Sequence, residues 1–170
     1  SGPKAQRAVG EPEAVVAAVC SPGLTDELGR RAWWAMEDAG NARRMLGNAA
    51  IVQGGMGPIL AEYLVEFLPF ETEMEKMAES VRLVLQPGLL AEQRCLELWH
   101  KAARKPSYAL GFLQARPDTL PDPVAARADF AAHAPGLGAL ISAGNAWAQA
   151  MARVLSAPGQ TWLKTVAQIL

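Results

Sequence analysis

The chain has 170 residues, of which 51% are hydrophobic and 19% charged, and its formal net charge is −1. This composition is typical of a globular domain and excludes general disorder. The balanced charge gives no overall attraction to nucleic acid or anionic lipid, so either partner would require a local basic patch. Cys20 and Cys95 form no Cys-x-x-Cys motif, which excludes a disulfide framework or a zinc site and favours the reducing cytoplasm.

The N-terminal stretch lacks the apolar core of a signal peptide. We expect residues 1–10 to be a flexible lead-in or a cloning remnant, and residues 11–170 to form a single helical domain.

Proline and glycine punctuate the rest of the chain, and apolar residues recur at helical spacing between these breaks. No segment alternates with period two, so the sequence predicts an all-α protein with about eight or nine helices. Short links between amphipathic helices favour antiparallel hairpins, and we expect an irregular stack of them, similar to HEAT-like repeats. Helices are predicted to begin at Thr25 and at Asp122, and to cover 58–69, 71–86, 89–104, 137–156 and 160–170.

The segment from Phe130 to Ala152 contains no Asp, Glu, Lys or Arg and is long enough to span a bilayer. Its polar side chains, however, fall on one side of the helix predicted over 137–156, and its apolar ones, including Trp147, fall on the other. A helix with this pattern belongs to a protein core, so we expect Trp147 to be enclosed and no membrane insertion.

The stretch "RRAWWAMEDAGNARRML" (30–46) contains two arginine pairs and two adjacent tryptophans. Neighbouring residues on a helix point about 100° apart, so Trp33 and Trp34 cannot share one buried seam. We expect Trp33 to pack inward and Trp34 to lie on the Arg30 side. The favoured interpretation packs Trp34 against the following helix, and the alternative is a contact site for a partner.

The second arginine pair, Arg43 and Arg44, opens the next predicted helix. Two pairs near one corner can grip a carboxylate or phosphate in bidentate fashion, although surface arginines beside Glu and Asp more often form local ion pairs. The candidate partner-binding residues are therefore Arg30, Trp34, Arg43 and Arg44. A protein partner is preferred, and an RNA or phosphate ligand at these arginines is an alternative.

Two stretches only superficially resemble chemical motifs. "QGGMGP" (53–58) lacks the Gly-Lys-Ser/Thr of a phosphate loop and predicts a turn between helices. Glu97 and His100 match half of a di-iron motif, but Phe130 stands where the other half would need a glutamate before His133. No metal, cofactor or catalytic constellation is predicted.

Cys95 lies on the apolar stripe of its helix and is expected to be buried and inert. Cys20 lies at the C-terminal end of a helix, where the helix dipole disfavours a thiolate. We expect both thiols to be buried. The alternative is a sulfur carrier that uses one of them.

Glutamates dominate residues 62–79 and basic residues follow in 94–105. They form either a solvated face whose charges pair across a hairpin or an acidic docking surface.

Four stretches, "RRAWWAMEDAGNARRML", "LAEYLVEFLPFE", "ESVRLVLQPGLL" and "LWHKAARKPSYALGFLQARPDTLP", give residues 20–121 a resemblance to the DsrS family. These are accessory proteins of the dissimilatory sulfite reductase system of sulfur-oxidising bacteria. The resemblance implies a cytoplasmic protein that supports or regulates the sulfur-oxidation machinery, and it carries over no catalytic residue. Together with the absence of a catalytic motif, it predicts a non-enzymatic helical scaffold or regulator that binds another protein.

Overall fold

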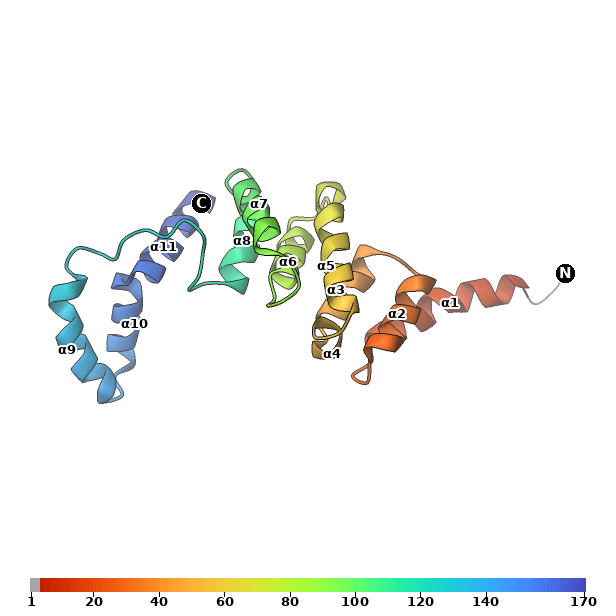
Figure 1. Cartoon of the computed structure of the whole chain (residues 1–170), viewed down its shortest axis with the longest axis horizontal. Helices are drawn as coiled ribbons and strands as arrows, with labels where there is room; N and C mark the ends of the chain where they lie inside the picture. Colours follow the sequence, from red (N-terminus) through yellow and green to blue (C-terminus); the bar gives the residue numbers. More distant parts are fainter. Residues whose placement is uncertain (1–3) are drawn as a thin grey trace. The chain divides into compact units, whose positions relative to one another are not determined.

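The fold comes from a computed structural model that describes residues 4–170, with side chains from residue 12 onward. Every regular element in this range is a helix, which confirms the all-α prediction (Figure 1). The described residues form eleven α-helices and one 3₁₀ helix, more than the eight or nine expected. Part of the predicted lead-in, residues 1–3, lies outside the described residues.

Contacts between residues divide the chain into two compact units, Ser1–Cys95 and Leu96–Leu170. The single domain predicted over 11–170 and the HEAT-like arrangement stay predictions. The first unit contains α1 (Lys4–Val19), α2 (Asp26–Ala35), α3 (Ala39–Leu46), α4 (Ala49–Val52), α5 (Met56–Phe67), η1 (Leu68–Phe70), α6 (Met74–Val84) and the start of α7 (Glu92–Ala102). The second contains the rest of α7 with α8 (Pro106–Ala115), α9 (Phe130–Ser142), α10 (Ala146–Leu155) and α11 (Ala157–Ile169).

Helix α5 is the centre of the first unit and packs against both α3 and α6. Its Leu60, Ala61 and Leu64 recur at helical spacing and are buried. The approach of α5 to α4 requires Gly57, because a Cβ there would lie 2.8 Å from the carbonyl oxygens of Ile51 and Val52. The predicted turn between two helices is present, but it covers only 53–55, because α5 begins at Met56 and not at Pro58.

The core of the second unit forms around α8, whose Tyr108 and Phe112 are buried and which packs against α11. The Trp99 ring meets Phe112 edge-on, with centroids 5.0 Å apart. The prediction that a helix starts at Asp122 is wrong, because α9 begins only at Phe130. Asp122 accepts a hydrogen bond from the Trp99 indole N–H (2.8 Å), and its φ of 55° differs from the extended backbone of an N-cap.

The prediction of a single helix over 137–156 is also wrong, because residues 143–145 separate two helices, α9 and α10, in this range. Gly144 adopts a left-handed φ of 82°, and the Asn145 side chain caps α10 by accepting the Ala148 N–H (3.1 Å). The break leaves Trp147 outside the core with its side chain 79% exposed, which overturns the expected enclosure. None of the described helices is long and apolar enough to cross a membrane.

Candidate partner-binding surface

Helix α2 begins where the sequence predicted, with the Thr25 side chain accepting the Leu28 N–H (3.2 Å). It buries Gly29, Ala32 and Trp33, which recur at helical spacing. The indole of Trp33 is 6% exposed and meets the Tyr63 ring edge-on, with centroids 4.7 Å apart. The prediction that Trp33 packs inward is confirmed.

The opposite side of α2 carries Trp34, and its ring is 78% exposed. The expectation that Trp34 packs against the following helix is therefore wrong. The reason is the arrangement of the neighbouring helices. Helices α1, α3, α4 and α5 all contact α2. They cover the side of α2 on which its buried residues lie, namely Gly29, Ala32 and Trp33. The 100° step from Trp33 turns Trp34 out of that contact.

Four residues share the exposed side of α2, because three of them precede the fourth by three, four or seven positions. They are Glu27, Arg30, Arg31 and Trp34, which we call the Trp34 face. Arg31 forms a 3.0 Å ion pair with Glu27, and the Arg30 guanidinium lies 4.0 Å from Asp26. These exposed pairs are worth little in stability, so a partner can displace them at small cost.

Asp26 also has a structural role that the sequence did not reveal. Its carboxylate accepts the backbone N–H of Met56 (2.9 Å) at the start of α5. The bond ties the first turn of α2 to the glycine-rich turn before α5, so the Trp34 face is anchored at its N-terminal end. Only the folded chain brings residues so far apart in sequence together.

Arg43, by contrast, lies inside the first unit and links α3 to the region of α6. Its side chain is 10% exposed, and it donates to Glu71 (3.1 Å) and to Ser80 (3.3 Å), with Glu79 at 3.8 Å. Burial acts to raise the pKa of Glu71, but the backbone N–H groups of Glu73 and Thr72 and the Arg43 guanidinium outweigh it and lower that pKa. The structure therefore does not bring Arg43 to the surface with Trp34.

Arg44 is exposed on α3, and its guanidinium donates to the side-chain oxygen of the buried Asn41 (3.2 Å). Asp38 caps the same helix by accepting the Asn41 N–H (2.8 Å). Of the four predicted site residues, the structure places Arg30 and Trp34 on one face, Arg44 on the surface of the next helix and Arg43 in the interior.

An aromatic row runs outward from the buried Trp33 over Tyr63 and Phe67 to the exposed Phe70. Burial raises the pKa of Tyr63, and the carboxylates of Asp38 and Glu37 raise it further. The row therefore links α2 to α5 and η1 through contacts between aromatic rings.

The structure shows ion-pair partners for some of the charged residues in 62–79 and 94–105. Arg94 donates two hydrogen bonds to Glu62, at 2.9 and 3.2 Å, so one basic residue does pair with an acidic residue of α5. Lys76 pairs within its own helix end with Glu73 (2.6 Å). These pairs favour the solvated-face interpretation for the residues involved.

The thiols divide. Cys95 is buried, as predicted, whereas Cys20 is exposed, which corrects the expectation that both are buried. Cys20 follows the last residue of α1, as the sequence indicated. Among the residues that the structure describes, no group of three or more His, Cys, Asp or Glu side chains could hold a metal ion.

A cavity of about 440 Å³ in the second unit was not predicted. Trp99, His100, Asp122, Thr161, Lys164 and Thr165 are among its lining residues. Asp122 already accepts the Trp99 N–H, and Thr161 and Thr165 donate to backbone carbonyls of α11. Asp122, Thr161 and Thr165 therefore already have hydrogen-bond partners within the protein.

The chain matches no family model, no curated protein and no solved structure in comparisons with all three.

Proposed function

We propose that the protein is a non-enzymatic helical scaffold or regulator that binds another protein through the Trp34 face. The observation that carries the proposal is Trp34, whose ring is 78% exposed on a helix that is otherwise well anchored. Trp and Arg are the side chains most enriched at the centres of protein interfaces. A rigid aromatic anchor flanked by guanidinium groups fits this role.

The partner surface that suits this face is an apolar socket for the indole with carboxylates at its rim. Arg30 and Arg31 would exchange their exposed partners Asp26 and Glu27 for carboxylates of the other protein. Arg44, on the surface of α3, adds a further donor, and Arg43 contributes by holding α3 against α6. Arg43 is thus a structural residue in this proposal.

The cellular setting of the proposal rests on the resemblance to the DsrS family over residues 20–121, which include α2 and α3. It supports a cytoplasmic role beside the sulfur-oxidation machinery. Cys95 does not support the sulfur-carrier alternative, because the residue is only 1% exposed. Arg43 does not support the RNA alternative, because it is paired with Glu71 and Glu79.

The test compares two equally exposed tryptophans. The full chain, Trp34→Ala and Trp147→Ala are immobilised, and proteins retained from a sulfur-oxidising cell extract are identified by mass spectrometry. A partner of the Trp34 face should be retained by the full chain and by Trp147→Ala, and should be lost with Trp34→Ala. Titration calorimetry of the purified partner should then show binding weakened about 30-fold or more by Trp34→Ala, as for an interface hot spot.

The proposal fails if the partner binds Trp34→Ala and Arg30→Gln as tightly as the unchanged protein. Circular dichroism and melting temperature of each variant verify that lost binding is not lost folding, because surface changes alter stability by less than about 0.5 kcal/mol.

A further inference from the structure

The α9–α10 hairpin is an apolar surface that its own unit hardly covers. Between Phe130 and Ala152 the chain carries no Asp, Glu, Lys or Arg. Helix α9 buries none of its residues, and α10 buries only Ala148 and Leu155. Large exposed apolar surfaces without charge are rare on monomeric proteins and mark interaction sites.

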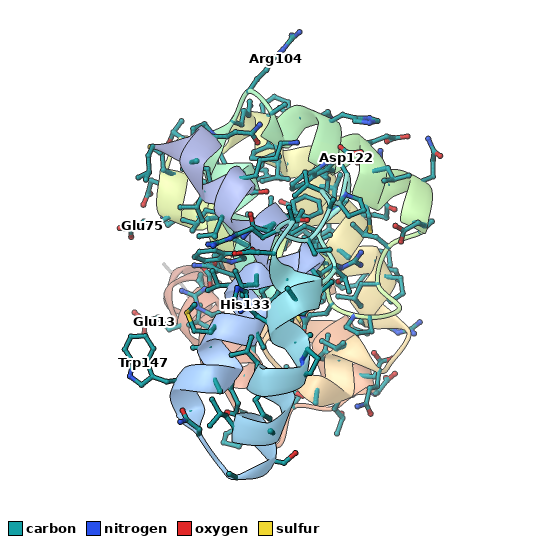
Figure 2. The ribbon with its side chains drawn as sticks, turned by 90° about the vertical axis from the view of Figure 1, so that its left-hand side faces the viewer. Glu13, Glu75, Arg104, Asp122, His133 and Trp147 are labelled. Atoms are coloured by element: carbon teal, nitrogen blue, oxygen red, sulfur yellow. The ribbon has the colours of Figure 1, made fainter. Side chains whose placement is uncertain are left out.

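The most apolar side of this hairpin is a line of three side chains on α10, at positions four and three apart. Trp147, Met151 and Val154 are 79%, 40% and 41% exposed, and they form what we call the α10 stripe. Figure 2 shows the Trp147 side chain projecting from α10 away from the neighbouring helix α9. The stripe is thus available to a partner, whereas Ala148 and Leu155 face the interior.

We propose that the α10 stripe is the interface of a homodimer, in which each copy covers the stripe of the other. In a two-fold contact each patch meets an identical patch, so a patch with an excess of one charge repels its copy and a patch without charge does not. The α10 stripe, which contains no charged side chain, satisfies this condition, whereas the Trp34 face, with two arginines and one glutamate, carries an excess of positive charge.

The area of the stripe is small for a dimer interface. A fully accessible Trp has up to about 250 Å², so the three side chains together expose roughly 350 Å². A standard interface buries about 800 Å² per partner, so the stripe supplies a little under half. Exposed Leu140 on the adjacent α9 extends the apolar surface. We therefore expect a weak, transient dimer.

A lipid surface suits the hairpin less well. Helices that lie in a membrane interface carry Lys and Arg on their polar side to attract anionic lipid. The charge-free segment has neither, and Arg153, just beyond it, is engaged by Asp118 at 2.9 Å. The physical chemistry therefore favours a protein surface of equal apolarity, which a second copy offers.

Sedimentation velocity on the full chain at about 1, 10 and 100 µM tests the proposal over the range expected for a weak interface. The expected result is a monomer–dimer equilibrium. Trp147→Ala should weaken it about 30-fold or more, as for a hot-spot side chain, and Met151→Arg should abolish it by placing like charges opposite each other. Trp34→Ala is the matched control, equally exposed but outside the stripe, and should dimerise normally.

A protein that stays monomeric at 100 µM would overturn the proposal. So would a dimer that resists Trp147→Ala and Met151→Arg, because its interface would lie elsewhere. Co-sedimentation with vesicles of phosphatidylcholine and phosphatidylglycerol supplies the third readout: binding that Trp147→Ala removes, without a dimer in solution, would assign the stripe to lipid instead. None of these outcomes depends on the partner of the Trp34 face.

Discussion

Trp34 and Trp147 are exposed to the same extent, 78% and 79%, yet they lie in opposite surroundings. Trp34 is on a helix whose other side is packed by four helices and whose exposed side carries two arginines. Trp147 is on a hairpin with few buried residues and no charged neighbour on its own segment until Arg153.

Exposure alone therefore does not define a binding surface. An excess of one charge around an apolar anchor favours a partner of opposite charge over an identical copy, whereas the absence of charge permits self-association. The four predictions below test this contrast, beginning with the largest expected effect.

The first prediction compares adjacent residues of α2. Trp33→Ala should lower the free energy of unfolding by about 3–5 kcal/mol, because it empties a buried site against Tyr63. Trp34→Ala should change it by less than about 0.5 kcal/mol. Urea unfolding followed by far-UV circular dichroism measures both. Equal losses for the two variants would contradict the assignment of Trp34 to the surface.

The second prediction separates the arginines of the candidate site. Arg43→Ala should destabilise the protein by about 2 kcal/mol, because it leaves Glu71 largely buried without its cation while two backbone N–H groups still bind the carboxylate. Arg31→Ala removes an exposed ion pair and should cost less than about 0.5 kcal/mol. Chemical unfolding at pH 7 measures both, and an unaffected Arg43→Ala would show that the buried cluster is energetically neutral.

The third prediction concerns acid. The folded pKa of Glu71 is below its ordinary value of 4.5, so its contribution to stability is complete above that pH and is lost as the pH falls through the folded pKa. Unfolding at pH 7 and pH 3 should therefore show a smaller acid-induced loss for Glu71→Gln than for the unchanged protein. An identical loss in both proteins would mean that Glu71 does not contribute to acid sensitivity.

The smallest effect is expected at the exposed tryptophans. In dilute solution Trp34→Ala and Trp147→Ala should each shift the melting temperature by no more than about 2 °C. At high protein concentration the dimer should raise the melting temperature of the unchanged protein and of Trp34→Ala, because association stabilises the folded state. Trp147→Ala should lack this dependence on concentration. A melting temperature independent of concentration in all three would remove the contrast.

Four features follow from the amino-acid sequence alone: the helical class, the start of α2 at Thr25, the turn between α4 and α5, and the inward direction of Trp33. These depend on local rules: the 3.6-residue period, the chemistry of caps and the conformations open to glycine and proline. The burial of Cys95 followed from the same period.

Which sides of the helices are covered depends instead on tertiary packing. The sequence pattern of 137–156 is that of a core helix, but Gly144 breaks it and Trp147 stays exposed. Arg43 and Arg44 are adjacent in sequence and equally polar, yet Glu71 and Ser80 draw Arg43 into the interior while Arg44 stays outside. Periodicity reports which residues share a side of a helix. Burial is decided by the elements that arrive from distant parts of the chain, whose positions no local pattern contains.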